Sequence, residues 1–217
     1  MMKINIENES SKLKAVLVGI ANDFGGTPKD EECYDPKSRA HVKAGTFPTN
    51  EVCVKEMNAL VTVFEKYNVK VFRPKNIKGL NQIFSRDIAF AIEDKLVIPN
   101  IIEDRKEEAD AIEEVILEIA KEDIIKMPLS TRAEGGDVMP WNDYIFIGTY
   151  SGDDYSDYIT ARTNMDAVIA LQELFPDKIV KSFELRKSNT DPKENALHLD
   201  CCFQPIGTNK AILHKNG

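Results

Sequence analysis

The chain has 217 residues, of which 28 are basic and 36 acidic, giving a formal net charge of −8. This balance argues against nucleic acid or an anionic membrane surface as a partner, because the sequence has no basic run. The length suits one large domain or two small ones, and a hydrophobic content of 42% is enough to form a core.

The cysteines and the N-terminus indicate where the protein works. The N-terminal segment lacks the apolar core of a signal peptide, and no apolar run approaches membrane-spanning length. Cys33, Cys53, Cys201 and Cys202 show no Cys-x-x-Cys spacing, so we expect reduced thiols in a cytoplasmic protein. Because the three histidines are scattered, we expect no metal site.

The first elements along the chain are a strand, a loop, a helix and a strand. We expect the strand at Leu13–Gly19, the helix at Glu51–Tyr67 and the second strand at Val69–Phe72. The segment Asn22–Arg39 is rich in Gly, Pro and Asp and is longer than most connections. Such a length favours a loop that lies over a site.

A unit of strand, strand, helix and strand then repeats. The predicted elements are a hairpin at Ile83–Asn100, a helix at Arg105–Lys121, a strand at Ile124–Met127, a hairpin at Val138–Thr149, a helix at Ala161–Phe175, a strand at Ile179–Leu185 and a hairpin at Leu197–His214. A chain that stops at a bare hairpin leaves a sheet edge uncovered. We therefore expect the front part of a longer protein, with cover by a partner as the alternative.

Three of these hairpins begin in the same way, with an Asp after a small or polar lead-in. The residues are Asp87, Asp137 and Asp200, which lie 50 and 63 positions apart. This spacing is typical of repeated supersecondary units. If the units are arranged around an axis, the carboxylates meet at a common centre.

Two further polar residues, Glu134 and His198, lie at the same hairpin starts as these carboxylates. Alone, His198 is best interpreted as a hydrogen-bonded core histidine, but the neighbouring carboxylates favour a functional one. Paired carboxylates suit a planar guanidinium, which they hold by charge-assisted hydrogen bonds. A Glu beside a His can orient the imidazole and raise its pKa, so that it donates and accepts protons.

The succession SRD, EGGD and HLD, each opening a hairpin, resembles the guanidino-group-modifying (pentein) superfamily of arginine deiminases, dimethylarginine dimethylaminohydrolases and amidinotransferases. The resemblance runs from about Leu13 to the end of the chain. It implies an α/β fold, an α/β-propeller of five ββαβ units around a pseudo-fivefold axis. Residues 1–217 would then be a single domain of about three and a half units, without the C-terminal unit.

The resemblance also implies roles for individual residues. Asp87 and Asp200 match the carboxylates that grip the substrate guanidinium, and Glu134 and His198 match the pair that moves protons. No cofactor is implied.

Two arginines and a loop can be matched in the same way. Arg105 and Arg162 match arginines that bind the substrate α-carboxylate in the hydrolases, although the sequence alone favours helix-surface arginines. Asn22–Gly26 would fall in the mobile loop of the first unit.

The family nucleophile is a cysteine after the fifth unit, which this chain lacks. In a regular strand, Cys201 would share the face of Leu199, and Cys202 the face of His198. In the complete enzyme the thiolate would attack the guanidinium carbon and expel ammonia or an amine, leaving a covalent intermediate. We expect this chain alone to turn over no guanidino substrate, and a longer product of the same gene to do so.

The expected function is that of an enzyme acting on arginine or an arginine derivative, and EGGD favours a hydrolase of the deiminase or dimethylargininase type. The alternatives are an amidinotransferase, a non-catalytic guanidino-binding protein if the chain ends at Gly217, and a purely structural repeat module. The expected partner is a small guanidino compound, with self-association into a homo-oligomer left open.

Overall fold

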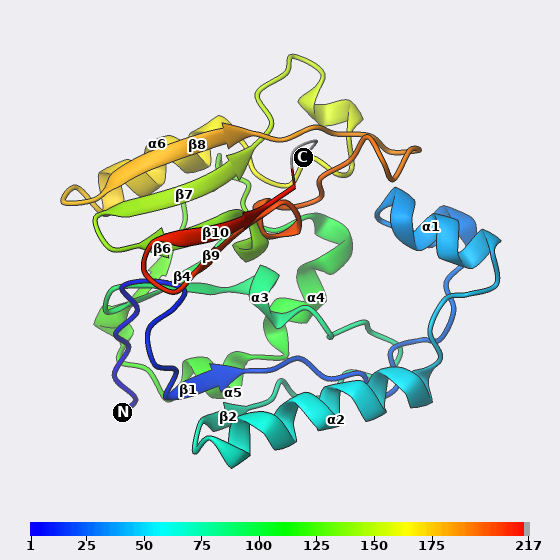
Figure 1. Cartoon of the computed structure of the whole chain (residues 1–217), viewed down its shortest axis with the longest axis horizontal. Helices are drawn as coiled ribbons and strands as arrows, with labels where there is room; N and C mark the ends of the chain where they lie inside the picture. Colours follow the sequence, from blue (N-terminus) through cyan, green and yellow to red (C-terminus); the bar gives the residue numbers. More distant parts are fainter. Residues whose placement is uncertain (215–217) are drawn as a thin grey trace.

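The computed structural model describes residues 1–214 as an α/β fold in which the strands form four small sheets (Figure 1). The last three positions of the expected 1–217 domain lie outside the described residues. In the first sheet, β1 (Ala15–Leu17) pairs in parallel with β2 (Lys70–Phe72). In the last, β9 (Phe203–Ile206) pairs antiparallel with β10 (Lys210–Leu213).

The two middle sheets each contain three strands and share one topology. Their strands are β3 (Phe90–Ile92), β4 (Lys95–Ile98) and β5 (Ile124–Lys126), and β6 (Val138–Trp141), β7 (Tyr144–Thr149) and β8 (Ile179–Glu184). In both sheets the first pair is antiparallel and the second pair is parallel, after a helical crossover. The predicted order of strand, strand, helix and strand is therefore confirmed in these two units.

The hairpin turns repeat the same backbone geometry. Glu93, Asn142 and Gly207 each have a positive φ, of 53°, 52° and 60°. Asn and Gly tolerate this left-handed conformation well, whereas Glu does so rarely. The equivalent turn in three hairpins supports the repeat that the sequence predicts.

Two long helices form the crossovers as predicted. Helix α2 (Asn50–Lys66) joins β1 to β2, and α6 (Met165–Leu174) joins β7 to β8. Thr49 caps α2 by accepting from the amide of residue 52, and Asn164 caps α6 by accepting from that of residue 167. Such caps satisfy amides that have no partner within the helix, which fixes where each helix begins.

The predicted helix at Arg105–Lys121 is wrong. Residues 105–121 are not one helix but short pieces: η2 (Glu103–Arg105), α4 (Lys106–Asp110), α5 (Glu113–Ile116) and η3 (Lys121–Asp123). The Ala111 carbonyl accepts instead from the amide of Lys75, which interrupts the helical ladder.

The second difference lies in the predicted loop at 22–39. This segment contains η1 (Asp30–Glu32) and the start of α1 (Pro36–Lys43). Asp35 caps α1 by accepting from the amides of residues 37 and 38, with Pro36 at the first helical position.

The main core lies between the two three-stranded sheets and α6. Its fully buried members include Ile92, Val97, Ile145, Ile147 and Leu171, each at 0% exposure. These residues come from both hairpins and from α6, so the core fixes the two units against each other. A rigid pair of units can hold the segments that precede the hairpins at fixed positions.

Three short helical turns precede the hairpins: α3 (Ser85–Ile88), η4 (Gly135–Asp137) and η6 (Leu199–Cys201). We call them the lead-in turns. α3 contacts η4, and η4 contacts η6, so segments far apart in sequence meet. Two predicted hairpins are therefore wrong in their first residues, because α3 replaces the start expected at Ile83 and η6 replaces the start expected at Leu197.

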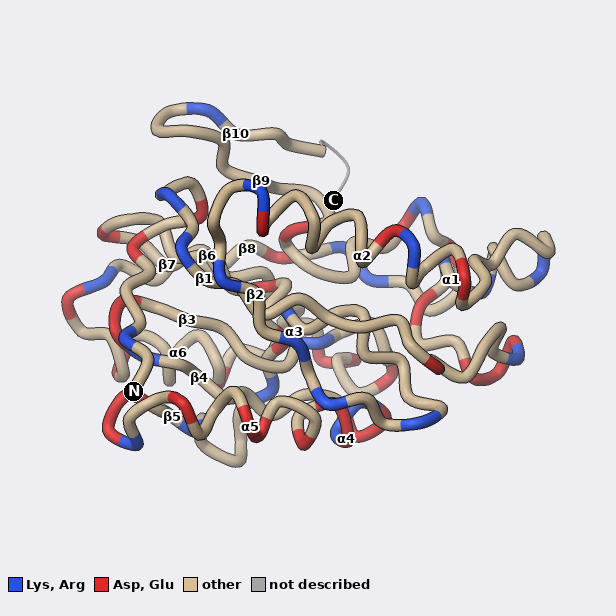
Figure 2. The backbone as a smooth tube through the Cα atoms, turned by 90° about the horizontal axis from the view of Figure 1, so that it is seen from below, with Lys and Arg blue, Asp and Glu red and all other residues tan. Residues whose placement is uncertain are grey.

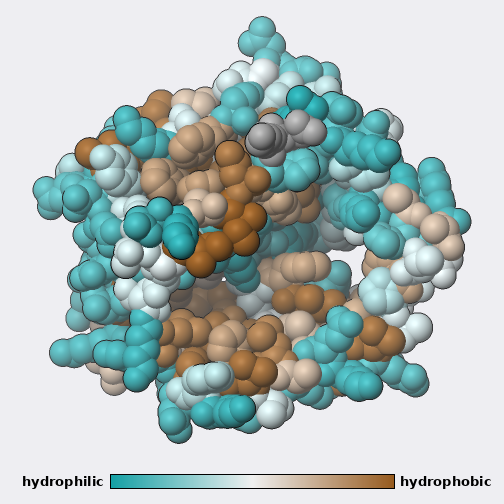
Figure 3. All heavy atoms as spheres, viewed as in Figure 1, coloured by the Kyte–Doolittle hydropathy of each residue, from teal (hydrophilic) through white to brown (hydrophobic). Residues whose placement is uncertain are grey.

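The surface carries charges of both signs. Basic and acidic residues are interspersed along the backbone (Figure 2). On the face of Figure 1, the surface is hollowed beneath the β9–β10 hairpin (Figure 3). Within residues 1–214, no helix combines the length and apolar character needed to cross a membrane.

Candidate functional site

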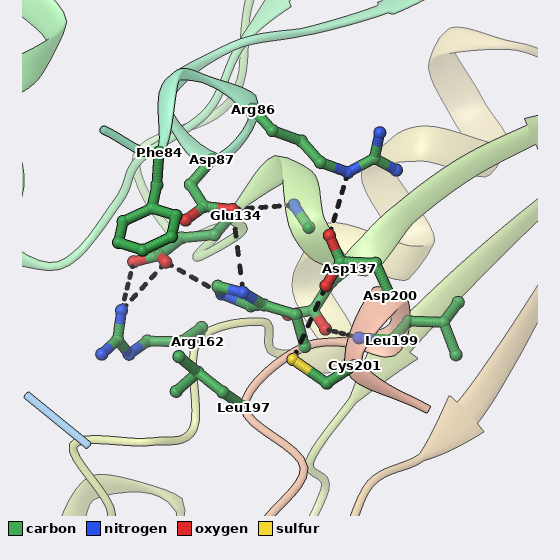
Figure 4. A network of polar contacts seen from close by, with 12 residues as sticks. Phe84, Arg86, Asp87, Glu134, Asp137, Arg162, Leu197, Leu199, Asp200 and Cys201 are labelled. Atoms are coloured by element: carbon green, nitrogen blue, oxygen red, sulfur yellow. Dashed lines mark hydrogen bonds and ion pairs between the residues drawn. The ribbon is translucent and has the colours of Figure 1, made fainter. Parts of the chain in front are cut away.

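The lead-in turns bring Asp87 and Glu134 close together (Figure 4), and His198 joins them in one buried cluster. Their exposed fractions are 6%, 0% and 4%. His198 Nε2 lies 2.9 Å from Glu134 Oε2, and His198 Nδ1 lies 3.7 Å from Asp87 Oδ1. The structure thus brings together three of the predicted site residues, from positions more than a hundred residues apart.

Gly136 in the EGGD segment allows this close approach. A Cβ at this position would lie 2.7 Å from His198 Nδ1 and 2.8 Å from Asp87 Oδ1. The Gly136 amide also donates to Asp87 Oδ1 at 3.2 Å. A side chain here would therefore push the imidazole and the carboxylate apart.

Arg105 occupies the centre of the cluster. Its Nη1 donates to Asp87 Oδ2 at 2.8 Å and to Glu134 Oε2 at 2.9 Å. Its Nε and Nη2 donate to the two carboxylate oxygens of Glu108 at 2.7 and 2.9 Å. The interpretation of Arg105 as a helix-surface arginine is wrong, because the residue is only 6% exposed.

Arg162 approaches Glu134 from another segment. Its Nη1 donates to Oε1 and Oε2 of Glu134 at 3.0 and 2.9 Å, and the residue is 2% exposed, so the surface interpretation is wrong here too. Its Nη2 donates to the Tyr34 carbonyl at 3.1 Å. Part of the predicted loop at 22–39 therefore touches the site.

The charges around Glu134 and His198 change their titration in opposite directions. Burial acts to raise the pKa of Glu134, but the His198 hydrogen bond and the charges of Arg162 and Arg105 lower it to about 2. Burial acts to lower the pKa of His198, but the Glu134 hydrogen bond and nearby carboxylates raise it above its ordinary value. The pair therefore favours a carboxylate facing an imidazolium.

Asp200 lies beside the cluster and pairs with a different arginine. Its Oδ2 lies 3.1 Å from Arg86 Nε, and Arg86 also pairs with Glu9 at 3.3 Å. Burial raises the pKa of Asp200, against the charges of His198 and Arg86. Each predicted guanidinium-binding carboxylate thus already contacts a guanidinium of the protein.

The cysteines nearest the site do not follow the predicted alternation. In η6, Cys201 Sγ lies 3.7 Å from Asp200 Oδ1, whereas Cys202 is buried against Met139 and Leu199. Cys202 therefore faces the core, contrary to the prediction. Cys201 is exposed to solvent as a residue, but partial desolvation of its thiol, opposed by a backbone hydrogen bond, raises its pKa to about 11. Burial raises the pKa of Cys202. Neither thiol is prepared as a thiolate.

One donor atom each from Asp87, Glu134 and His198 lie within 4.8 Å of one another, a spacing that a metal ion could bridge. However, carboxylate oxygens of this cluster already accept from Arg105 and Arg162. A metal would have to displace these guanidinium groups. The absence of a metal site stays a prediction.

Sequence reasoning missed several residues that support the site. Glu108 holds Arg105, and its spacing of three residues from Arg105 was the available signal. Asp137 accepts from the Leu199 amide at 2.9 Å and from Thr163 Oγ1 at 2.6 Å. The repeat had placed Asp137 at a hairpin start, but nothing in the pattern indicated Thr163.

Comparisons with known proteins place this geometry in context. A family model described as eukaryotic N,N dimethylarginine dimethylhydrolase matches residues 37–216. The chain is 28% identical over 173 residues to the uncharacterized protein YkgA of Bacillus subtilis (strain 168), a match that covers 77% of this chain and 54% of that protein. The chain thus spans about half the length of this curated relative.

Solved structures share the fold. An amidinotransferase, SxtG of Microseira wollei from a saxitoxin biosynthetic pathway, superposes with a TM-score of 0.74 at 17% identity, over 98% of this chain and 70% of that one. The N-terminal domain of ArgZ, a cyanobacterial arginine dihydrolase bound to substrate, superposes with a TM-score of 0.68 at 16% identity. The match covers 92% of this chain and 66% of that one. A cysteine-to-serine mutant of the Pseudomonas aeruginosa dimethylarginine dimethylaminohydrolase, in complex with citrulline, superposes with a TM-score of 0.61 at 16% identity. The match covers 82% of this chain and 63% of that one.

Proposed function

Because the chain belongs to the N,N dimethylarginine dimethylhydrolase family, we propose that it supplies the guanidinium-binding and proton-transfer residues of an enzyme acting on arginine or an N-substituted arginine. Its superfamily includes the dimethylarginine dimethylaminohydrolases, the amidinotransferases and the arginine dihydrolases. One observation carries the proposal: Asp87, Glu134 and His198 meet in a buried cluster from three separate hairpin starts.

Asp87 and Asp200 hold the substrate guanidinium. Their contacts with the protein's own arginines support this role, because Asp87 accepts a hydrogen bond from Arg105 and Asp200 forms an ion pair with Arg86. A ligand guanidinium takes the place of Arg105 on Asp87 Oδ2. Arg105 stays anchored through its two bonds to Glu108, so the exchange does not leave it unpaired.

Arg105 and Arg162 bind the α-carboxylate of the substrate. Both donate to Glu134 through guanidinium nitrogens, so both lie at the same end of the cluster. The Tyr34 carbonyl accepts from Arg162 Nη2, so the segment that contains Tyr34 lies against this part of the site. The fork of a guanidinium matches a carboxylate in two parallel hydrogen bonds.

His198 carries protons, and Glu134 orients it. A cysteine thiolate attacks the guanidinium carbon, and the C–N bond to ammonia or dimethylamine breaks while the imidazolium protonates the leaving nitrogen. Water then adds to the amidino carbon and gives its proton to His198, and the C–S bond breaks to regenerate the thiolate. The raised pKa of His198 supports its role as the acid of the first step.

The thiolate itself comes from none of the four cysteines of this chain. Burial raises the pKa values of Cys33 and Cys53, and the pKa values of Cys201 and Cys202 are also raised. Among residues 1–214, the β1–β2 and β9–β10 sheets have two strands each, whereas the middle sheets have three. We therefore propose that further polypeptide completes a single α/β-propeller domain and brings the nucleophile.

A hydrolase of the dimethylargininase or deiminase type is the first candidate, and the family match supports it. An amidinotransferase is the second, since the likeness to SxtG extends over 98% of the chain. In that reaction an amine takes the place of water in the second step. A non-catalytic guanidino-binding protein would use the same carboxylates without a thiolate.

Ligand-induced melting shifts test the binding step. We expect arginine and Nω,Nω-dimethylarginine to raise the melting temperature by mass action, and citrulline, which is neutral at the same position, to have a smaller effect. Asp87→Asn should remove the guanidinium-dependent rise. Asp94→Asn is the matched control, because Asp94 is an exposed hairpin carboxylate paired with Lys95.

Product analysis separates the candidates. The 217-residue chain should release no citrulline, ornithine or dimethylamine, whereas a polypeptide with the completing segment should release citrulline with ammonia or dimethylamine. Ornithine formed only when an acceptor amine is present would select the transferase. Equal melting shifts with arginine for Asp87→Asn and the native chain would remove Asp87 from the site.

A further inference from the structure

Two buried, oppositely charged side chains hold the main chain on either side of His198. Lys187 Nζ donates to the carbonyls of Ala196 and Leu197, both at 2.9 Å. On the other side, Asp137 Oδ1 accepts from the Leu199 amide at 2.9 Å. The bonds therefore engage the two residues immediately before His198 and the one immediately after it.

Both holding groups are removed from solvent. Lys187 is 9% exposed and Asp137 is 1% exposed. Burial lowers the pKa of Lys187 and raises that of Asp137, in each case against the attraction of opposite charges nearby. An apolar side chain at position 187 could fill the space without desolvating an ammonium. The ammonium group, unlike an apolar side chain, donates two hydrogen bonds to main-chain carbonyls.

The surroundings of Asp137 leave its carboxylate little freedom. Its second oxygen accepts from Thr163 Oγ1 at 2.6 Å. A Cβ at Gly148 would lie 2.6 Å from Asp137 Oδ1 and 2.9 Å from Leu199 Cβ, so this glycine lets strand β7 pass close behind the bond. The carboxylate is fixed by the neighbouring strand, and the Leu199 amide is fixed by the carboxylate.

We propose that Lys187 and Asp137 are positioning residues, which hold the main chain around His198 so that its imidazole stays in contact with Glu134. The His198 Nε2–Glu134 Oε2 distance of 2.9 Å depends on where the main chain places the ring. A displacement of about 1 Å would break this hydrogen bond. This assignment rests on the proposed function, in which His198 carries the proton.

A positioning role and a purely electrostatic role of Lys187 predict opposite changes in the pKa of His198 in Lys187→Met. If Lys187 acted only by its positive charge, its removal would raise the pKa of His198. If it positions His198, its removal loosens the contact with Glu134 and lowers that pKa. We expect a fall of about one pH unit, since a carboxylate partner at hydrogen-bonding distance shifts a pKa by about 1–3 units.

The measurement is an NMR titration of the histidine imidazoles, with the other two signals assigned through His41→Gln and His214→Gln. Lys181→Met is the matched control, because Lys181 is exposed on strand β8 and should leave the His198 titration unchanged. Lys187→Gln keeps a neutral amide donor and should give an intermediate fall in the pKa of His198. An unchanged or raised His198 pKa in folded Lys187→Met protein would overturn the proposal.

A second measurement needs no variant. In the native chain, the Leu199 amide should exchange with deuterium at least about tenfold more slowly than exposed amides of the same hairpin, because it is bonded to buried Asp137. Exchange at the rate of exposed amides would contradict the Asp137 half of the proposal. Arginine binding to the native chain is measured separately, so failure of the proposed function is distinguished from failure of this positioning role.

Discussion

Two ion pairs with the same three-residue spacing lie next to each other in one segment, and they differ in almost every physical respect. Arg105 pairs with Glu108 at 2.7 Å, with side chains 7% and 6% exposed. Lys106 pairs with Glu103 at 3.3 Å, with side chains 72% and 85% exposed. Sequence spacing alone treats the two pairs as equivalent.

The two pairs differ in how strongly their charges affect stability, because one pair is exposed and the other is buried. An exposed pair contributes about 0–1 kcal/mol, because water and salt screen it. The buried pair belongs to a network in which Arg105 also contacts Asp87 and Glu134. Removing one member of such a network leaves buried charges without compensation. The buried charges of the proposed binding site therefore affect the free energy of unfolding more than the exposed Lys106–Glu103 pair does.

Arg105→Met gives the largest expected effect. It leaves the buried carboxylates of Asp87, Glu108 and Glu134 with fewer positive partners, so the free energy of unfolding should fall by about 3–5 kcal/mol. Urea denaturation at neutral pH measures the change. A loss below about 1 kcal/mol would mean that water reaches the network and that the comparison fails.

The pH dependence of stability comes next. Glu134 has an ordinary pKa of 4.5 that the site lowers to about 2, so its contribution is present above about pH 4.5 and is lost as the pH falls toward 2. The loss should be about 3 kcal/mol. His198 has a raised pKa, so its contribution is present below 6.5 and is lost as the pH rises through its folded pKa.

Unfolding experiments on Glu134→Gln at several pH values separate the contribution of Glu134 from those of other titrating groups. In Glu134→Gln the loss between pH 4.5 and 2 should be smaller by about this amount, since no carboxylate titrates at that position. The same slope in the variant and the native chain would show that other acids cause the loss.

Lys106→Met gives the smallest expected effect. Because the Lys106–Glu103 pair is exposed, the free energy of unfolding should change by less than about 0.5 kcal/mol. Added salt should reduce this change in the free energy of unfolding further, because it screens the exposed pair. A loss as large as that of Arg105→Met would mean that burial does not distinguish the pairs.

Two features could be predicted from the sequence: the repeated unit, and the cluster that polar residues from its hairpin starts form. Hydrophobic periodicity located α2, α6 and both three-stranded sheets, and the spacing of hairpin starts brought Asp87, Glu134 and His198 together. These features are encoded locally, by apolar patterns and turn residues.

Other features depend on contacts between distant segments. The break after α4 follows from the Lys75–Ala111 hydrogen bond, which no local pattern signals. The pairing of Asp200 with Arg86 and the role of Lys187 arise from tertiary placement. The alternation expected for Cys201 and Cys202 failed because a 3-10 turn replaces the start of the strand.

The most direct test of the central claim, that the lead-in turns form a guanidinium site, is a crystal structure of the chain with Nω,Nω-dimethylarginine. We expect the ligand guanidinium within about 2.7–3.2 Å of the Asp87 carboxylate, with Arg105 displaced from Oδ2 but still bonded to Glu108. A ligand bound elsewhere, with Arg105 still on Asp87, would contradict the account.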